Sequence, residues 1–92
     1  MFQWNDKKSA ANKTKHGIDF ESAKQLWNDP FRVEIQTSYS DENRSILIGK
    51  IGGKLWTAIF TIRGKSIRII SVRRSRKREK DLYGQKETSQ KR

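Results

Sequence analysis

Residues 55–73 read LWTAIFTIRGKSIRIISVR, and this stretch predicts the central hairpin of the protein. Apolar and polar side chains alternate on both sides of Gly64-Lys65, a pattern typical of two strands joined by a tight II′-type turn. A two-residue turn fixes which residues of the two strands face each other. The predicted pairs are Arg63–Ser66, Ile62–Ile67, Thr61–Arg68, Phe60–Ile69 and Ile59–Ile70.

This register places the side chains of the hairpin on two different faces. One face is apolar and is predicted to join the core; it carries Trp56, Ala58, Phe60, Ile62, Ile67 and Ile69. The other face carries hydroxyls and arginines, namely Thr57, Thr61, Arg63, Ser66 and Arg68. Because guanidinium groups bind phosphate oxygens well, the second face is predicted to be a phosphate platform.

The alternation fails once, where Ile69 and Ile70 are adjacent. Either the strand bulges there, or it is a central strand that is covered on both faces. In a regular register Arg73 would point into the core, where an unpaired charge is costly. A bulge would return Arg73 to the face that carries Arg68.

The residues before the hairpin predict two helices. Asn5 or Asp6 can cap a helix over residues 6–16, and Gly17 is placed to end it. Asp19 caps a second helix, which ends at Asn28. An apolar stripe of this helix is predicted to cover the core face of the sheet, and it consists of Phe20, Ala23, Leu26 and Trp27.

Further strands are predicted on either side of a polar loop over residues 38–43. Alternation over residues 31–36 indicates one strand, and the apolar run over residues 46–48 opens the next. Gly52-Gly53 predicts the following hairpin turn. Phe2-Gln3-Trp4 at the start of the chain can form a brief edge strand.

The C-terminal segment predicts one more helix, which Ser75 caps and which runs through Tyr83 with Gly84 behind it. The predicted fold is α+β, with two N-terminal helices packed on a four-stranded antiparallel sheet and a short C-terminal helix. Residues 1–84 form a single domain, and residues 85–92 are expected to be a flexible basic tail.

Charge is the most informative feature of the composition. The 92 residues include 21 Lys and Arg against 10 Asp and Glu, a formal net charge of +11. This charge repels itself unless a polyanion or an acidic partner neutralises it, and nucleic acid fits best because each Lys or Arg contact to a phosphate releases counterions. The sequence has no basic amphipathic helix with a broad apolar face, which argues against a membrane surface. The polar start over residues 1–15 predicts neither a signal peptide nor a transmembrane helix, so a cytoplasmic protein is expected.

The basic residues are concentrated between Arg63 and Lys80, where nine Lys and Arg accompany a single acidic residue, Glu79. The run begins on a sheet face and continues into the last helix, which favours an RNA-binding surface over a merely solvated basic face. The residues expected to steer RNA and to contact its backbone are Lys65, Arg74, Arg76, Lys77 and Arg78.

Three further side chains could take part in chemistry. His16 either contacts the carbonyls at a helix C-terminus or transfers protons, for which imidazole is suited near neutral pH. Glu79 is either an ion-pair partner within the basic run or a general base. Tyr83 either docks the last helix or acts as a catalyst. With one histidine and no cysteine a zinc site is not expected, and no cofactor is predicted.

An ordered set of stretches over residues 2–83 resembles BrnT-type toxins. They are Phe2-Gln3-Trp4-Asn5 with Lys7, Asn12, Lys15 to Glu21, Ile48-Gly49-Lys50, Phe60 to Gly64, Ile67 to Arg74, Arg78-Glu79 and Tyr83. The sequence departs from the family pattern at Ile62, where an acidic or polar residue is typical, and at Val72, where Ala is usual.

The resemblance implies a RelE-like ribonuclease toxin from a bacterial type II toxin–antitoxin operon. Its partner would be a BrnA-like ribbon-helix-helix antitoxin, which binds DNA and masks the toxin in a hetero-oligomer. The implied activity is metal-independent RNA cleavage that inhibits translation and growth.

In the implied chemistry the RNA 2′-hydroxyl attacks the adjacent phosphate, while protein groups move protons and stabilise the phosphorane. Arg63, Arg68 and Arg73 would bind the scissile phosphate. Glu79, His16 or Tyr83 would transfer the protons. The alternative is a basic module that binds RNA or an acidic antitoxin without catalysis.

Overall fold

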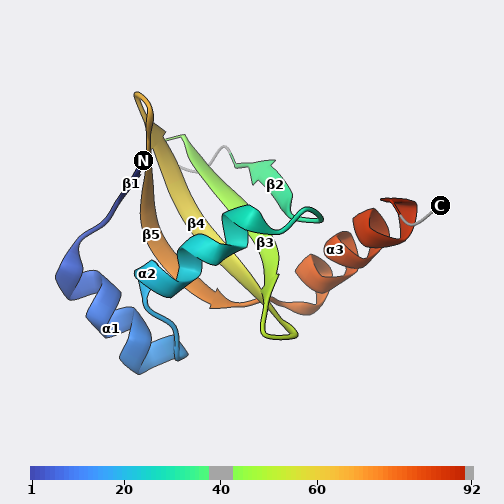
Figure 1. The fold of residues 1–92 in the computed structure, drawn as a ribbon, viewed down its shortest axis with the longest axis horizontal. Coiled ribbons are helices and arrows are strands. Elements are labelled where there is room, and N and C mark those ends of the chain that lie inside the picture. Colours follow the sequence, from blue (N-terminus) through green and yellow to red (C-terminus); the bar gives the residue numbers. More distant parts are fainter. Residues whose placement is uncertain (38–42, 91–92) are drawn as a thin grey trace.

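The computed structural model describes residues 1–37 and 43–90, whose arrangement is shown in Figure 1. A five-stranded sheet has the strand order β1-β5-β4-β3-β2. Its strands are β1 (Phe2–Gln3), β2 (Val33–Gln36), β3 (Arg44–Ile51), β4 (Lys54–Arg63) and β5 (Ser66–Arg74). The helices are α1 (Asp6–His16), α2 (Phe20–Ala23), the 3-10 helix η1 (Lys24–Asn28) and α3 (Lys77–Gln90).

The expected α+β class is confirmed, but the sheet has five strands where four were predicted. The additional strand is β1, which pairs with β5 in parallel, so the sheet is mixed. Phe2 lies opposite Ile67, and its ring packs edge-on against Trp27 at a centroid distance of 5.1 Å. The brief edge strand is thus part of the sheet, and Phe2 together with Trp4 packs it against the core.

The register of the β4–β5 hairpin is confirmed for the four pairs from Arg63–Ser66 to Phe60–Ile69. The fifth prediction is wrong, because Ile59 pairs with Ser71 and leaves Ile70 as an extra residue. This is the predicted β-bulge. Beyond it, Arg73 lies opposite Thr57 and thus on the face away from the core. Gly64 has a φ of 59°, which a tight turn of this kind requires.

The N-terminal helices begin where capping residues were predicted. Asn5 Oδ1 accepts a hydrogen bond from the Lys8 amide, and Asp19 Oδ1 accepts one from the Ser22 amide. Gly17 ends α1 with a φ of 84°. The second predicted helix is divided, because its last turn tightens into η1.

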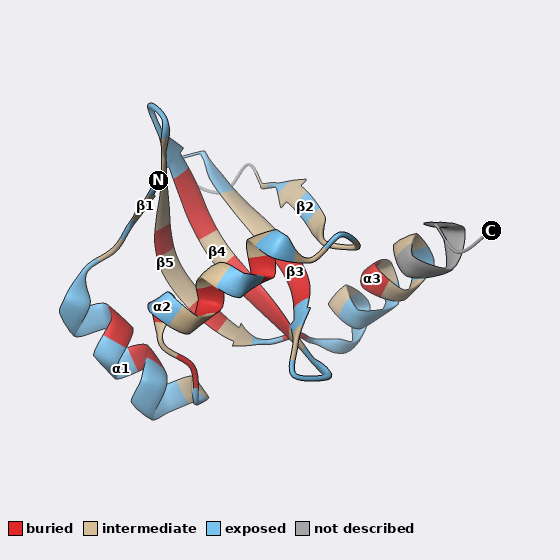
Figure 2. Cartoon of the chain, in the orientation of Figure 1, coloured by how far each residue is buried: buried red, intermediate tan, exposed pale blue. Residues whose placement is uncertain are grey.

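The core lies between α2–η1 and one face of the sheet (Figure 2). The predicted stripe contributes Phe20, Ala23 and Leu26, all fully buried, with Trp27 packed against the cluster. Helix α1 lies along the edge of β5 (Figure 1), where the buried amide of Asn12 bonds both the N–H and the C=O of Val72. The Asn12 side chain therefore supplies the hydrogen bonds that the backbone of β5 lacks where β1 no longer pairs with it.

The last helix is longer than predicted. It continues through Gly84 to Gln90, so the expected end at Gly84 is wrong, and the expected tail begins inside α3. A helical Gly costs only about 1 kcal/mol relative to Ala, which a tertiary contact can offset. Lys86 supplies such a contact by donating to the Arg32 carbonyl at 2.6 Å. Residues 91–92 lie outside the described residues, and so do residues 38–42, which make up most of the loop predicted over residues 38–43.

Candidate active site

The sheet face away from the core carries the predicted platform in rows that cross the strands. One row contains Arg44, Thr61 and Arg68, which face each other on β3, β4 and β5. A second row contains Ile46, Ile59 and Ser71, and a third contains Ile48, Thr57 and Arg73. Neighbouring rows are two residues apart along a strand, or about 7 Å.

Arg73 is held by Glu79 from the first turn of α3. Its Nη1 and Nη2 atoms donate to Glu79 Oε1 and Oε2, both at 2.8 Å. The exposed fractions of the two side chains are only 21% and 12%. A planar, two-point ion pair of this kind fixes the orientation of the guanidinium as well as its position.

Further hydrogen bonds hold the Glu79 carboxylate. Oε1 also accepts from the Arg76 amide at 2.7 Å and from Thr57 Oγ1 at 3.0 Å. Because the single proton of Thr57 is used in this bond, Ser75 must be the donor in the 2.9 Å bond between the two hydroxyls. Ser75, predicted as a helix cap, thus acts in this network.

The network changes the ionisation of both partners. Burial alone would raise the pKa of Glu79, but hydrogen bonds from Arg73, the Arg76 amide and Thr57 outweigh burial and lower that pKa from 4.5 to about 2. The same hydrogen bond raises the pKa of Arg73 above its ordinary value. Glu79 is therefore a firmly ionised partner of Arg73 and only weakly basic.

A hollow of about 380 Å³ lies beside this pair on the same face. It is lined by Thr37, Arg44, Ile46, Ile59, Arg73 and Glu79. Arg44 was not among the predicted site residues. Arg44 follows the polar loop directly, and the sequence of a loop does not tell which residues of the next strand pair with β4. The observed β3–β4 register places Arg44 in the same row as Arg68.

The predicted hydroxyls are less open than the sequence indicated. Thr57 is fully buried and Thr61 is 4% exposed, whereas an open platform was expected. Thr57 is covered by the residues that start α3, and it serves Glu79. The arginines remain on the rim: Arg68 is half-buried, and Arg44 and Arg63 are exposed.

Tyr83 is placed away from the arginine rows. It is 3% exposed, and its hydroxyl donates to Asp29 Oδ2 at 2.8 Å. Lys50 lies 5.5 Å from the centre of its ring. The contacts of Tyr83 dock α3 against the start of β2 and the end of β3, which was one of the two predicted roles.

His16 lies at the edge of the sheet and not in the hollow of Arg73. It lines a separate depression between α1 and β5, together with Lys8, Lys15, Ile70 and Ser71 as well as other residues of α1. Ser71 is opposite Ile59, so the depression begins at the end of the isoleucine row. The structure thus brings together Arg73 and Glu79, but sets His16 and Tyr83 apart from them.

The basic residues predicted to contact the RNA backbone fall into two groups. Lys65, Arg76, Lys77 and Arg78 are exposed at the hairpin turn and at the start of α3. Arg74 instead faces the core side, because it lies opposite Trp56 and 5.4 Å from the centre of that ring. It points away from Arg73, its neighbour in sequence.

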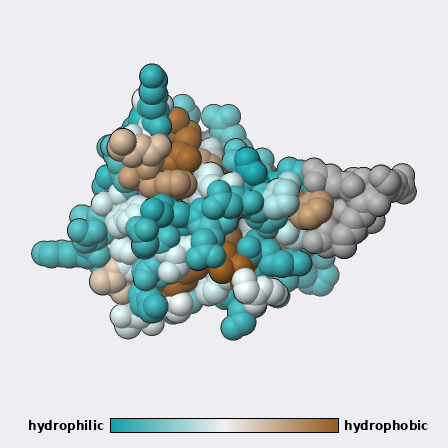
Figure 3. All heavy atoms as spheres, in the orientation of Figure 1, coloured by the Kyte–Doolittle hydropathy of each residue, from teal (hydrophilic) through white to brown (hydrophobic). Residues whose placement is uncertain are grey.

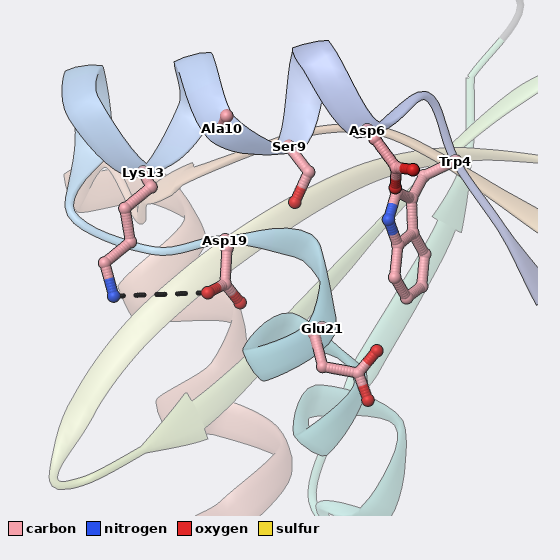
Figure 4. A pocket seen from close by; sticks show the side chains of 7 residues that line it. All are labelled: Trp4, Asp6, Ser9, Ala10, Lys13, Asp19 and Glu21. Carbon is pink, nitrogen blue, oxygen red and sulfur yellow. Dashed lines mark ion pairs between the residues drawn. The ribbon is translucent and has the colours of Figure 1, made fainter.

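Two other surfaces are poorly suited to a polyanion. The hollow between α1 and α2, about 550 Å³, is lined by three carboxylates, Asp6, Asp19 and Glu21, and Lys13 lies 4.0 Å from Asp19 (Figure 4). On the face that carries α2, hydrophobic atoms gather beside the β4–β5 hairpin (Figure 3), where Ile62 is 57% exposed.

Within residues 1–37 and 43–90, no helix is long and apolar enough to cross a membrane. The same residues contain no group of three His, Asp or Glu side chains placed to hold a metal ion.

Comparison with known proteins adds the family. No curated protein matches the chain closely enough to count as a relative. The family model described as a ribonuclease toxin, BrnT, of type II toxin–antitoxin systems matches residues 4–79. This range contains the arginine rows and ends at Glu79. The chain therefore belongs to the BrnT family of ribonuclease toxins of type II toxin–antitoxin systems.

Proposed function

We propose that the protein cleaves RNA without a metal ion, by attack of the 2′-hydroxyl on the adjacent phosphate. The observation that carries this proposal is the position of Arg73. It is fixed by Glu79 on the sheet face away from the core, beside a hollow that a second arginine, Arg44, also lines. Preorganised positive charge of this kind stabilises the negative charge that develops on a phosphorane.

The arginines have separate tasks in this mechanism. The bonds of Arg73 to Glu79 and to the Arg74 carbonyl use three of its five N–H groups within the described chain. Its remaining N–H groups can bind a phosphate oxygen. Arg44 and Arg68 lie in the row next to Ile46 and Ile59 and bind the neighbouring phosphates. Arg63 lies on the same face, nearer the hairpin turn, and can contact a further phosphate.

Proton transfer falls to a group other than Glu79. A carboxylate with a pKa of about 2 takes up a proton poorly at neutral pH, so Glu79 acts as a positioning residue for Arg73. The Tyr83 hydroxyl donates its hydrogen bond to Asp29, which supports a docking role. Water in the hollow is the proposed proton carrier, and His16, which lies in a separate depression at the β5 edge, can act only through such water.

Steering and partners follow from the charge and the family. Lys65, Arg76, Lys77 and Arg78 attract RNA and contact its backbone, whereas Arg74 lies on the other face. We further propose a RelE-like fold, cytoplasmic action on translation, and a BrnA-like ribbon-helix-helix antitoxin as partner. These finer proposals rest on family membership and on the basic surface.

The test is incubation of purified, antitoxin-free protein with RNA in excess EDTA. Cleavage is expected to persist in EDTA, and Arg73→Ala should lower kcat by about 100-fold or more, as loss of a preorganised charge does. The matched control is Lys54→Ala, an exposed cation at the far end of β4, which should leave cleavage unchanged.

Two results would overturn the proposal in different ways. Cleavage that EDTA abolishes and Mg²⁺ restores would show a metal-dependent nuclease. Tight RNA binding without cleavage, over a range of pH and salt, would show the basic binding module instead.

A further inference from the structure

Three isoleucines form a continuous apolar strip on the arginine face. Ile35 on β2 lies opposite Ile46 on β3, which lies opposite Ile59 on β4. Each of the three is half-buried and stands outside the core cluster. Helix α3 meets β2 and β3 at the other ends of these strands, through Asp29, Arg32 and Lys50. The strip is therefore an apolar surface on the face that also carries Arg44, Arg68 and Arg73.

Guanidinium groups flank this strip on both sides. Arg44 belongs to the row on one side, and Arg73 belongs to the row on the other. Both rows are about 7 Å from the strip, because same-face neighbours are two residues apart along a strand. The hollow of about 380 Å³ joins them, since Arg44, Ile46, Ile59 and Arg73 all line it.

A ligand that is complementary to this surface must have a flat, apolar part that packs on the isoleucines and an anionic group on each side that pairs with an arginine. A nucleotide within an RNA strand has this character, because each base is attached between two phosphates and presents an apolar face. We propose that one nucleobase beside the scissile phosphate packs on Ile46 and Ile59, while Arg44 and Arg73 bind the phosphates on its two sides. This inference rests on the proposed function and names the subsite that positions its substrate.

The chemistry of the strip also sets its selectivity. Isoleucine side chains offer no hydrogen-bonding groups, so the floor of the subsite does not read the edge of a base. Apolar contact grows with buried area, and a purine covers more surface than a pyrimidine. A purine at this position is therefore cleaved faster than a pyrimidine, with little distinction between adenine and guanine.

The experiment combines a protein change with a substrate change. The substrates are two RNA oligonucleotides with one mapped cleavage position, one normal and one with an abasic ribose at the proposed base position. The variants are Ile59→Thr and Ile46→Thr, which keep a β-branched side chain suited to a strand but replace apolar surface with a hydroxyl. The matched control is Ile62→Thr, which changes an exposed isoleucine of the same strand on the opposite face.

For the wild type and the Ile62 control, removal of the base should slow cleavage and weaken binding by roughly tenfold. For the two strip variants the normal and abasic substrates should behave alike. If the abasic penalty is as large in the strip variants as in the wild type, the subsite is wrong while RNA cleavage stands.

Equilibrium binding at fixed salt separates this inference from the proposed function. Base-dependent binding that Ile59→Thr removes, without any cleavage, would keep the subsite and overturn the nuclease mechanism. If Ile59→Thr leaves RNA binding unchanged and instead weakens the complex with an acidic protein partner, the strip is a protein-docking surface and the inference fails. Denaturation curves of each variant verify that the folded protein is compared in every case.

Discussion

The guanidinium of Arg73 donates to both carboxylate oxygens of Glu79, each at 2.8 Å, and this pair joins the end of β5 to the first turn of α3. The pair exists only because Ile70 is an extra residue in β5. In a regular ladder Arg73 would face α2 and the core. One bulged residue thus decides on which side of the sheet this positive charge is presented.

The Arg73–Glu79 pair predicts an acid-sensitive contribution to stability. The pKa of Glu79 is about 2 in the folded protein against an ordinary value of 4.5, so between these pH values the unfolded chain binds more protons. The contribution is complete above pH 4.5 and is lost as the pH falls toward 2. Glu79→Gln should cost about 1–3 kcal/mol at pH 7.

Urea denaturation at several pH values measures this effect. The difference in unfolding free energy between wild type and Glu79→Gln should shrink steadily from pH 5 to pH 2. A difference that stays constant over this range would show that the carboxylate charge does not stabilise the fold.

Asn12 predicts a distinction between two conservative substitutions. Its amide donates to the carbonyls of Ile18 and Val72 at 2.7 and 2.9 Å, and its oxygen accepts from the Val72 amide at 3.2 Å. Asn12→Ala should destabilise the protein by about 1–3 kcal/mol, because buried backbone groups lose their partners. Asn12→Asp should be worse at pH 7, since a carboxylate cannot donate to either carbonyl and its charge is buried. Equal midpoints for the two variants in thermal unfolding would contradict this account.

Gly49 and Gly84 predict opposite responses to the same substitution. A Cβ at Gly49 would lie 3.1 Å from Leu26 Cδ2 and 3.2 Å from the Leu26 carbonyl oxygen, so η1 would have to move away from β3. Gly49→Ala should therefore destabilise the protein by about 1–3 kcal/mol. A Cβ at Gly84 meets nothing within 4 Å, and α3 is helical there. Gly84→Ala should stabilise by about 0.5–1 kcal/mol. Denaturant midpoints compare the two, and a loss of stability in Gly84→Ala would argue against a continuous helix at that position.

Tyr83→Phe separates docking from catalysis. Loss of the hydroxyl removes its bond to Asp29 and should lower the unfolding free energy by about 1 kcal/mol. The phenyl ring still fills the site under α3, so the rate of RNA cleavage per folded molecule should be unchanged. A large fall in kcat with little change in stability would instead place Tyr83 in the mechanism.

The sequence predicted the parts of the fold that depend on local geometry. A two-residue turn at Gly64 fixes the hairpin register. The adjacent Ile69 and Ile70 indicated either a bulge or a strand covered on both faces, and the bulge that would place Arg73 beside Arg68 is present. Gly17 ends α1 through its left-handed backbone conformation, and Asp19 begins α2 through its capping side chain.

Features that depend on long-range contacts were predicted less well. A brief edge strand at Phe2-Gln3-Trp4 was expected, but not its parallel pairing with β5 as a fifth strand of the sheet. The length of α3 is linked to the Lys86 bond to Arg32. The place of Arg44 in the site depends on how β3 pairs with its neighbours. The loop before β3 is too long to define that register, unlike the two-residue turn at Gly64. The burial of Thr57 depends on a helix that returns over the sheet.

Basic residues are divided between the two faces of the sheet, and this division predicts how RNA binding depends on salt. Each Lys or Arg that contacts a phosphate of single-stranded RNA releases a counterion and contributes about 0.7 to the slope of log affinity against log salt concentration. Arg68 lies on the platform row with Thr61, so Arg68→Ala should reduce the magnitude of this slope by about 0.7. Arg74 covers Trp56 on the opposite face, so Arg74→Ala should leave the slope unchanged although both variants lose one positive charge. Titrations of a fixed RNA oligonucleotide between 50 and about 200 mM salt provide the slopes. Equal reductions in the two variants would mean that RNA wraps around the end of β5, and the single-face platform would then be wrong.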